Sequence, residues 1–379
     1  MKISFVTTMA GDAWGGSEEL WAELAILASK NNNVFVSIYD WGTLPNKMSG
    51  LEKNGIVIDR RKRISYSSFT GKIKGKINQV LFAKKELVDF IAKSNPDHVV
   101  ISMGGFSDLE INPLRDFLLM LDIPYSLIVH ANPETRKIDK KKRALVKEVC
   151  LQAENVYFVS KRLQQIAERQ IAYAFPNARI VANPVNMKET GVLPWRDSDT
   201  MEMALVGRLD VSIKGQALLL QILSQDKWRE RPFRLNLYGE GPDKDIIEEL
   251  IAFYGLEDKV FLHGHVNDIR QDIWTTNHIL LMPSYYEGLP LALVEAMMSG
   301  RTAVATDVGG NAELITDEID GFIAEGATYF SFDKALEHAW DKQEEWNKMG
   351  QNAFVKANKY FEKYDYKTVF SKVIRNEEY

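Results

Sequence analysis

Two carboxylates stand eight positions apart in the segment PSYYEGLPLALVEAMMSG, residues 283–300. Pro290 suits the first turn of a helix, because the N–H that it lacks has no intrahelical partner there. Glu287 is therefore expected just before this helix, and Glu295 about a turn and a half inside it among apolar residues. An unpaired charge buried there is costly, so Glu295 should meet hydroxyls or a cation. An exposed helix residue or a structural salt bridge is the alternative.

The start of the same predicted helix could hold an anion. The amides of Gly288, Leu289 and Leu291 are free to donate, and the helix dipole favours negative charge beside them. Phosphate alone would not explain the carboxylate of Glu287. A ligand that also carries hydroxyls, such as a sugar, would.

Two cations follow a predicted strand in VGRLDVSIKGQ, residues 206–216. Arg208 and Lys214 bracket a loop before a helix, where charge-assisted hydrogen bonds from both could hold a diphosphate. Ordinary surface cations are the alternative.

Glycines at other predicted strand ends allow the backbone to approach a ligand closely. Gly15 and Gly16 lie in GDAWGGSEEL, which lacks the G-x-G-x-x-G spacing of a dinucleotide site, and Ser17 could cap the helix that follows. Gly239 lies in YGEGPDKD, where a flat ligand such as a base could lie close to the chain. A simple tight turn would use the same glycines.

In this order and at these spacings, the residues resemble those of the retaining glycosyltransferase family 4 (group 1 glycosyltransferases), which has the GT-B fold. The likeness spans nearly the whole chain and is strongest over residues 203–326. Its signature is the E-x7-E pair, which appears here as Glu287 and Glu295. Many members have Gly-x-Gly after the first glutamate, whereas residues 288–290 of this chain are Gly-Leu-Pro.

The resemblance implies roles on the donor side. The helix amides behind Glu287 would bind the donor diphosphate, while Glu287 itself would contact hydroxyls of the transferred sugar. Glu295 would take the ribose hydroxyls. Arg208 and Lys214 match the family's phosphate-neutralising pair in the pattern G-R-x5-K-G, which begins here at Gly207.

Further residues complete the expected site. Gly15 and Gly16 match a glycine loop near the donor phosphates and the acceptor. His130 matches a histidine that contacts the donor hexose, although Ala-Asn follows it where an acidic residue is often found. The base, uracil or guanine, would be read by the backbone around Gly264 and Val266.

Short β-branched runs alternate with longer amphipathic stretches along the chain, which is typical of buried parallel strands joined by helices. The predicted strands are residues 3–8, 34–39, 56–58, 98–103, 125–130, 156–160, 179–182, 203–208, 234–239, 260–264, 278–284, 302–307 and 321–324. The polar segment 183–200 between the two series is predicted to be a linker.

This alternation predicts an α/β protein, and with the resemblance a GT-B fold of two Rossmann-like, doubly wound domains facing a central cleft. We expect an N-terminal acceptor-side domain over residues 1–185 and a C-terminal nucleotide-sugar donor-binding domain over residues 186–355. A C-terminal helical segment, 356–379, should pack back on the first domain.

Composition favours a soluble, cytoplasmic protein. The chain has 379 residues, 45% of them apolar, and a single cysteine, Cys150, so it cannot form an internal disulfide. No stretch approaches the roughly 18 apolar residues of a spanning helix, and the first residues do not match a signal peptide.

The net charge of −5 is unevenly distributed. Residues 1–187 hold 26 Lys and Arg against 19 Asp and Glu, whereas the remainder holds 21 against 33. The excess lies in residues 60–93, where cations alternate with apolar residues, and in residues 136–143. This pattern suits a peripheral contact with an anionic membrane on its cytoplasmic face. Solvated charge beside a soluble acceptor is the alternative, and nothing resembles a nucleic-acid recognition motif.

We expect neither a metal nor a cofactor. Asp-x-Asp patterns occur at residues 197–199 and 243–245, but the first lies in the predicted linker and the second opens a predicted helix, where acidic residues are favoured. The helix dipole, Arg208 and Lys214 could stabilise a leaving diphosphate without a cation.

The sequence therefore predicts a retaining hexosyltransferase that uses a UDP- or GDP-sugar and a glycan or lipid-linked glycan acceptor, as in bacterial surface polysaccharide or glycolipid synthesis. A GT-B epimerase or phosphorylase would share the architecture. A non-catalytic sugar-nucleotide-binding subunit is the remaining alternative, and it would release no nucleotide from a donor.

Overall fold

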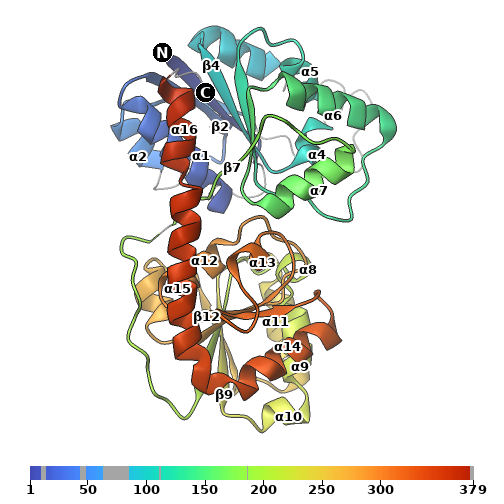
Figure 1. The fold of residues 1–379 in the computed structure, drawn as a ribbon, viewed down its shortest axis with the longest axis vertical. Coiled ribbons are helices and arrows are strands. Elements are labelled where there is room, and N and C mark those ends of the chain that lie inside the picture. Colours follow the sequence, from blue (N-terminus) through green and yellow to red (C-terminus); the bar gives the residue numbers. More distant parts are fainter. Residues whose placement is uncertain (10–13, 43–47, 63–84, 111, 186, 376–379) are drawn as a thin grey trace. The chain divides into compact units, whose positions relative to one another are not determined.

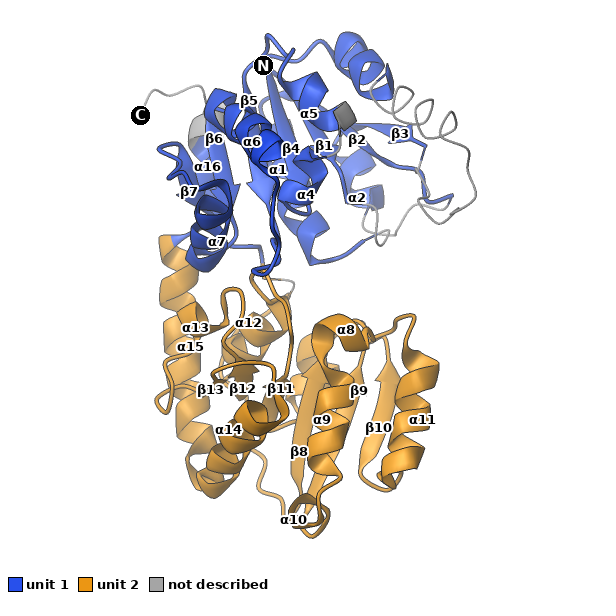
Figure 2. Ribbon diagram, turned by 90° about the vertical axis from the view of Figure 1, so that its right-hand side faces the viewer, with its two compact units in different colours: residues 1–184, 364–379 blue, residues 185–363 orange. Residues whose placement is uncertain are grey.

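The computed structural model describes residues 1–9, 14–42, 48–62, 85–110, 112–185 and 187–375. The chain forms two compact units (Figure 2). Unit 1 comprises Met1–Pro184 and Tyr364–Tyr379, and unit 2 comprises Val185–Lys363. Each unit is a parallel β-sheet with helices packed on its faces (Figure 1).

The sheet of unit 1 has seven strands: β1 (Lys2–Thr7), β2 (Asn33–Tyr39), β3 (Val57–Arg61), β4 (His98–Met103), β5 (Tyr125–Val129), β6 (Asn155–Phe158) and β7 (Ala178–Ile180). They pair in parallel in the order β3-β2-β1-β4-β5-β6-β7. The order reverses between β1 and β4, so the carboxyl ends of these two strands mark the place where doubly wound sheets bind ligands.

The helices of unit 1 are α1 (Gly16–Ser29), α2 (Met48–Lys53), α4 (Phe106–Leu109), α5 (Asn112–Leu118), α6 (Lys140–Gln152), α7 (Lys161–Ile171) and α16 (Tyr366–Arg375), and residues 85–94 are also helical. The last of these, α16, packs against α1, and Phe370 stacks on Tyr157 of β6 with ring centroids 4.3 Å apart.

The sheet of unit 2 has six strands: β8 (Met201–Val206), β9 (Phe233–Tyr238), β10 (Val260–Gly264), β11 (Ile279–Met282), β12 (Thr302–Thr306) and β13 (Phe322–Ala324). They pair in parallel in the order β10-β9-β8-β11-β12-β13. Here the order reverses between β8 and β11, and the predicted donor residues follow these strands.

The helices of unit 2 are α8 (Val211–Lys214), α9 (Gln216–Leu223), α10 (Asp226–Arg229), α11 (Lys244–Tyr254), α12 (Leu291–Met298), α13 (Asn311–Leu314), α14 (Tyr329–Asp341) and α15 (Trp346–Lys363), with short turns η1 (Arg270–Trp274) and η2 (Gln343–Glu345). The donor-binding domain was predicted to end at residue 355. That position falls inside α15, which stays with unit 2 as far as Lys363.

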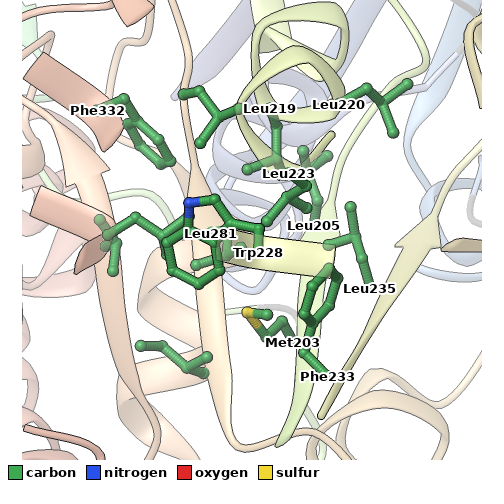
Figure 3. Packing of buried hydrophobic residues seen from close by; sticks show 14 of the residues in the cluster. Met203, Leu205, Leu219, Leu220, Leu223, Trp228, Phe233, Leu235, Leu281 and Phe332 are labelled. Atoms are coloured by element: carbon green, nitrogen blue, oxygen red, sulfur yellow. The ribbon is translucent and has the colours of Figure 1, made fainter. Parts of the chain in front are cut away.

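One face of the second sheet carries the core of unit 2 (Figure 3). Met203 and Leu205 alternate along β8, as Leu235 and Leu237 do along β9, and all four are buried with Trp228 of α10. Because side chains alternate between the two faces of a strand, the residues between these contribute to the opposite face.

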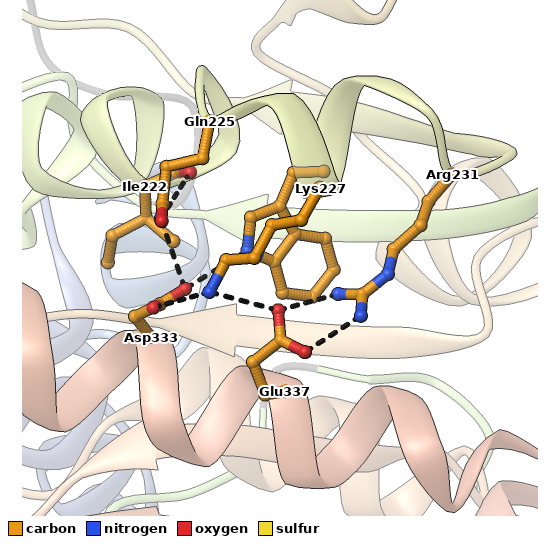
Figure 4. A network of polar contacts seen from close by, with 7 residues as sticks. Ile222, Gln225, Lys227, Arg231, Asp333 and Glu337 are labelled. Carbon is orange, nitrogen blue, oxygen red and sulfur yellow. Dashed lines mark hydrogen bonds and ion pairs between the residues drawn. The ribbon is translucent and has the colours of Figure 1, made fainter.

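A polar network fixes α14 to α10 at the rim of this core (Figure 4). The two terminal nitrogens of Arg231 each donate to one oxygen of Glu337 at 2.7 Å, and these hydrogen bonds hold the pKa of Glu337 below its usual range. Lys227 lies 2.7 Å from an Asp333 oxygen, and the Trp228 indole donates to the other at 3.0 Å.

The thirteen predicted strands are confirmed, with ends that shift by at most three residues. The segment predicted as a linker is irregular, but it is not a free connection. The amides of Gly191 and Leu193 donate to carbonyls at the end of α12, and the guanidinium of Arg301, 1% exposed, donates to the carbonyls of Leu193 and Pro194. Most of this segment therefore belongs to unit 2. No helix among the described residues is both long and apolar enough to span a bilayer.

His98 is a buried titratable group at the start of β4. It is 4% exposed, its Nε2 lies 3.1 Å from the Ser126 hydroxyl, and its Nδ1 lies 3.6 Å from a Glu154 oxygen. Burial outweighs the attraction of the exposed Glu154 and lowers the pKa of His98 from 6.5 to about 4. The folded protein therefore holds this imidazole neutral.

We predict that the free energy of unfolding falls as the pH is lowered from 6.5 towards 4. In this range the unfolded chain binds a proton at residue 98 that the folded chain does not, so the depressed pKa makes folding less favourable, by about 3 kcal/mol at the lower end. Urea unfolding across this range should show a shallower pH dependence in His98→Asn than in the unaltered protein. Parallel curves would contradict this.

Candidate functional site

Glu287 and Lys214 form an ion pair at the carboxyl edge of the second sheet. The Lys214 Nζ lies 2.7 Å from Glu287 Oε1, and the Ser284 hydroxyl donates to the same oxygen at 2.7 Å. Glu287 is only 8% exposed. Its Oε2 accepts no hydrogen bond from the described residues, so this is the oxygen that a ligand hydroxyl could use.

A glycine brings the two charged residues together. Lys214 ends α8, and Gly215 follows with φ +71°, a left-handed conformation that glycine adopts without strain. A Cβ at Gly215 would collide with the carbonyl oxygen of Pro283. The amide of Tyr285 also donates to the Ile213 carbonyl at 2.8 Å, so α8 rests directly on the loop that carries Glu287.

The start of α12 agrees with the sequence prediction to within one residue. Pro290 is the N-cap and the helix begins at Leu291. The amides of Gly288, Leu289 and Leu291 donate to no acceptor among the described residues, which leaves three donors beside Glu287. The Gly288 carbonyl accepts the amide of Gly310 at 2.7 Å, so the loop before α13 supports this turn.

Glu295 is the fifth residue of α12 and is 4% exposed. Of the alternatives weighed from the sequence, an exposed helix residue is therefore wrong. A structural polar partner and ligand hydroxyls are the two remaining ways to stabilise this buried carboxylate.

Arg208 is exposed on the loop after β8, and its backbone is held in place. The Gln216 side chain, which is fully buried, donates to the Arg208 carbonyl at 2.9 Å. A Cβ at Gly239 would collide with the carbonyl of Gly207. The glycine after β9 therefore lets the carboxyl ends of β8 and β9 lie close together. Sequence reasoning missed Gln216 and Ser284, which lie within three residues of the predicted charges.

The loop predicted to read the base follows β10. Gly264 has φ +69° and its carbonyl accepts the amide of Gly239 at 2.8 Å. Val266 is partly exposed two residues later. Gly239 and Gly264 thus lie at neighbouring strand ends, as the parallel pairing of β9 and β10 requires.

In unit 1, His130 follows β5 at the carboxyl edge of the first sheet. It is 6% exposed, and its Nε2 lies 3.0 Å from the Ser102 hydroxyl. Burial lowers the pKa of His130 to about 3, so the ring is neutral at physiological pH. Its Nδ1 is buried without a hydrogen-bond partner among the described residues.

The glycine loop of unit 1 begins α1 two residues earlier than a cap at Ser17 would. Gly15 is the N-cap and Gly16 the first helical residue, so the expectation that Ser17 caps the helix is wrong. The Glu18 carboxylate accepts the Gly15 amide at 3.1 Å and the Ser17 hydroxyl at 2.7 Å. A glutamate three residues after the N-cap is a capping-box signal that the sequence contained.

A further carboxylate lies where the strand order of unit 1 reverses. Asp108 of α4 accepts hydrogen bonds from the Thr8 hydroxyl at 2.6 Å and the Gly104 amide at 2.9 Å. Burial raises the pKa of Asp108. The sequence contains a local signal for this turn, which is the Gly-Gly pair directly after the predicted strand 98–103.

Within the described ranges, no group of three or more His, Cys, Asp and Glu is arranged to hold a metal ion. Asp243 instead accepts the amide of Val211 at 2.9 Å, which fixes the start of α8. The predicted site residues therefore form two sets. Unit 2 holds both glutamates, Lys214 and Arg208, and unit 1 holds His130 with the glycine loop.

Comparison with known proteins agrees with this arrangement. Residues 196–356 match the model of the family described as glycosyl transferases group 1. Alpha-D-kanosaminyltransferase of Streptomyces kanamyceticus is 26% identical over 216 residues, 57% of this chain and 53% of that protein. Lipopolysaccharide 1,6-galactosyltransferase of Escherichia coli (strain K12) is 25% identical over 165 residues, 42% of this chain and 45% of the relative.

A shorter match lies in a second enzyme of Escherichia coli. The UDP-Gal:alpha-D-GlcNAc-diphosphoundecaprenol alpha-1,3-galactosyltransferase is 35% identical over 86 residues, 23% of this chain and 22% of that protein. The matched segments of these three relatives thus span about half of the relative's length or less.

The fold extends the likeness over the whole chain. The crystal structure of Anabaena Alr3699/HepE in complex with UDP-glucose superposes with a TM-score of 0.73 and 17% identity, covering 99% of each chain. At this identity the likeness shows the fold alone, which is GT-B, with two Rossmann-like α/β domains. Over residues 196–356, which make up most of unit 2, the chain is similar to the group 1 glycosyltransferase family.

Proposed function

We propose that this protein is a retaining glycosyltransferase of family 4 that moves a hexose-type sugar from a UDP- or GDP-sugar to a glycan or lipid-linked glycan. The observation that carries the proposal is the contact of 2.7 Å between Lys214 and Glu287, beside amides at the start of α12 that donate to no acceptor in the described part of the chain. A cation suited to a leaving phosphate thereby lies next to a carboxylate suited to sugar hydroxyls.

The reaction requires loss of a diphosphate and an oxocarbenium-like centre at the sugar. In this mechanism the amides of Gly288 and Leu289, Lys214 and Arg208 stabilise the developing negative charge, the largest contribution that the protein can make. Glu287 accepts hydrogen bonds from the transferred hexose through Oε2. The acceptor hydroxyl attacks from the face that the diphosphate leaves, and the departing phosphate takes its proton.

Two further residues take ligand roles in the proposal. Glu295 accepts the ribose hydroxyls, the role that the resemblance to family 4 implies for the second glutamate of the E-x7-E pair. His130 contacts the hexose as a neutral imidazole through Nδ1, the nitrogen that has no partner among the described residues. Its depressed pKa keeps a positive charge away from the oxocarbenium-like centre.

The similar proteins support the proposed classes of donor and acceptor. The HepE structure holds UDP-glucose, which supports a nucleotide-sugar donor. The two E. coli relatives are named for transfer to lipopolysaccharide and to a diphosphoundecaprenol-linked sugar, which supports a surface or lipid-linked glycan acceptor. We place the reaction in bacterial surface polysaccharide or glycolipid synthesis. Release of UDP or GDP from a panel of nucleotide sugars tests the proposal, and a protein that only binds the donor would release none.

The two glutamates should differ in what they affect. Glu295→Ala should weaken UDP or GDP binding by about 1.5–3 kcal/mol, because charged hydrogen bonds to the ribose are lost. Glu287→Gln should reduce turnover while it leaves nucleotide affinity nearly unchanged, since Glu287 addresses the sugar. Isothermal titration and steady-state kinetics on both variants measure this. Equal losses of nucleotide affinity would overturn the division of roles.

Arg208→Ala and Lys214→Ala should each lower kcat on the order of a hundredfold, as removal of a transition-state charge stabiliser does. Lys244→Ala, an exposed lysine of α11 in the same unit, is the matched control and should keep full activity. If either site variant raised only KM for the donor, its cation would bind ground state and transition state equally.

Activity should persist in EDTA, because the proposed mechanism stabilises the leaving diphosphate with Arg208, Lys214 and helix amides and requires no metal. Sugar transfer is measured before and after chelation and again with added Mn²⁺. Loss of transfer in EDTA with recovery in Mn²⁺ would show that the leaving group needs a cation.

A further inference from the structure

A cluster of cations lies at the start of α6 in unit 1. Between residues 134 and 147 the sequence has seven Lys and Arg against two acidic residues. This segment follows β5 and His130, so it begins at the carboxyl edge of the first sheet. Residues 63–84, the other basic part of the chain, lie outside the described residues.

Three of the seven cations have structural partners. Glu110, next to α4, accepts from Arg136 at 3.0 Å and from Lys142 at 3.2 Å. Lys147 lies 3.7 Å from the centre of the Tyr173 ring. These contacts tie the segment to its neighbours and account for the charges involved.

The other four have no such partner. Lys137, Lys140, Lys141 and Arg143 make no ion pair with any carboxylate in the described part of the chain. The three lysines are exposed and Arg143 is partly exposed. We call these four residues the α6 basic surface.

Their position works against the stability of the helix. Three of the four lie in the first turn of α6, where the helix dipole is positive. This turn has no acidic residue, and the carboxylate beside it, that of the N-cap Asp139, accepts the amides of Lys141 and Lys142. Acidic residues are the stabilising choice at such a position. The ion pair that Asp139 makes here is with Lys142, at 3.8 Å, so the cost of placing Lys140, Lys141 and Arg143 in this turn is not offset by an ion pair of their own among the described residues. Residues that break a local rule in this way indicate a function.

We propose that the α6 basic surface docks unit 1 on an anionic phospholipid bilayer. Four uncompensated cations within seven consecutive residues match the diffuse negative potential of such a surface, which attracts each Lys or Arg independently. The purpose of this docking rests on the proposed function. Docking would bring the acceptor-side edge of unit 1 near a lipid-linked glycan in the bilayer.

The chemistry of the surface favours a bilayer over a soluble anion. A specific phosphate site would use convergent, partly buried donors, often the planar fork of arginine. Here three of the four groups are exposed lysines, which are flexible point charges, and none of the four is buried. Single-stranded nucleic acid would also require aromatic residues for stacking, and none occurs among residues 134–147.

The test is co-sedimentation of the full chain with sucrose-loaded vesicles. One set contains about 30% phosphatidylglycerol in phosphatidylcholine and the other phosphatidylcholine alone, each at low and high salt. We expect binding to the anionic vesicles only, and less at high salt. The variant Lys137→Gln, Lys140→Gln, Lys141→Gln should bind the anionic vesicles on the order of a hundredfold more weakly, because three attractions to the surface are removed.

The matched control removes three exposed lysines from unit 2, Lys244→Gln, Lys348→Gln and Lys359→Gln, and should bind as the unaltered protein does. Absence of binding to anionic vesicles, equal losses in both triple variants, or equally tight binding to single-stranded DNA would each overturn the proposal. Release of nucleotide from the donor by the same proteins reports separately on the proposed function.

Discussion

The cost of holding a carboxylate away from water governs the architecture around Glu287. At 8% exposure this side chain needs a cation and a donor close by, and Lys214 and Ser284 supply them on a single oxygen. That requirement brings α8 against the loop after β11, and the approach is possible only because Gly215 has no Cβ. The second oxygen of Glu287 accepts no hydrogen bond from the described residues. In the function that we propose, this ion pair is a pre-organised half of the donor site.

The sequence predicted the sheets well because buried parallel strands have a strong local signal. Each run of β-branched and apolar residues that was predicted as a strand is one, and the segment around Pro290 begins a helix as expected. The positions of Glu287 before a helix and of Lys214 at the end of the loop after β8 were also predictable from charge and spacing. Their direct contact was not, because it depends on how α8 and the β11 loop pack, and no sequence pattern encodes that distance.

The parts that the sequence misjudged share a physical cause. Residues 183–200 have linker composition, yet Arg301 binds the carbonyls of this segment from a position more than a hundred residues later. Burial lowers the pKa of Arg301 to about 10, and hydrogen bonds to several carbonyls offset its desolvation. The hydrogen bond between Thr8 and Asp108 is likewise long-range, and although the glycines at residues 104 and 105 indicate a turn before Asp108, they do not indicate this partner. Long-range polar contacts of this kind leave no local trace.

The two units use one topology with opposite electrostatics. Both place their polar groups at the carboxyl ends of strands beside the reversal of strand order, but residues 1–187 carry a net charge of +7 and residues 188–379 carry −12. If unit 2 binds an anionic nucleotide, as we propose, an acidic unit must rely on a few local cations, which would explain why Arg208 and Lys214 occur together with helix amides. In a basic unit, cations without ion pairs can instead be spread over an exposed surface. By our proposals, the same topology thus binds a compact anion in unit 2 and an extended anionic surface in unit 1.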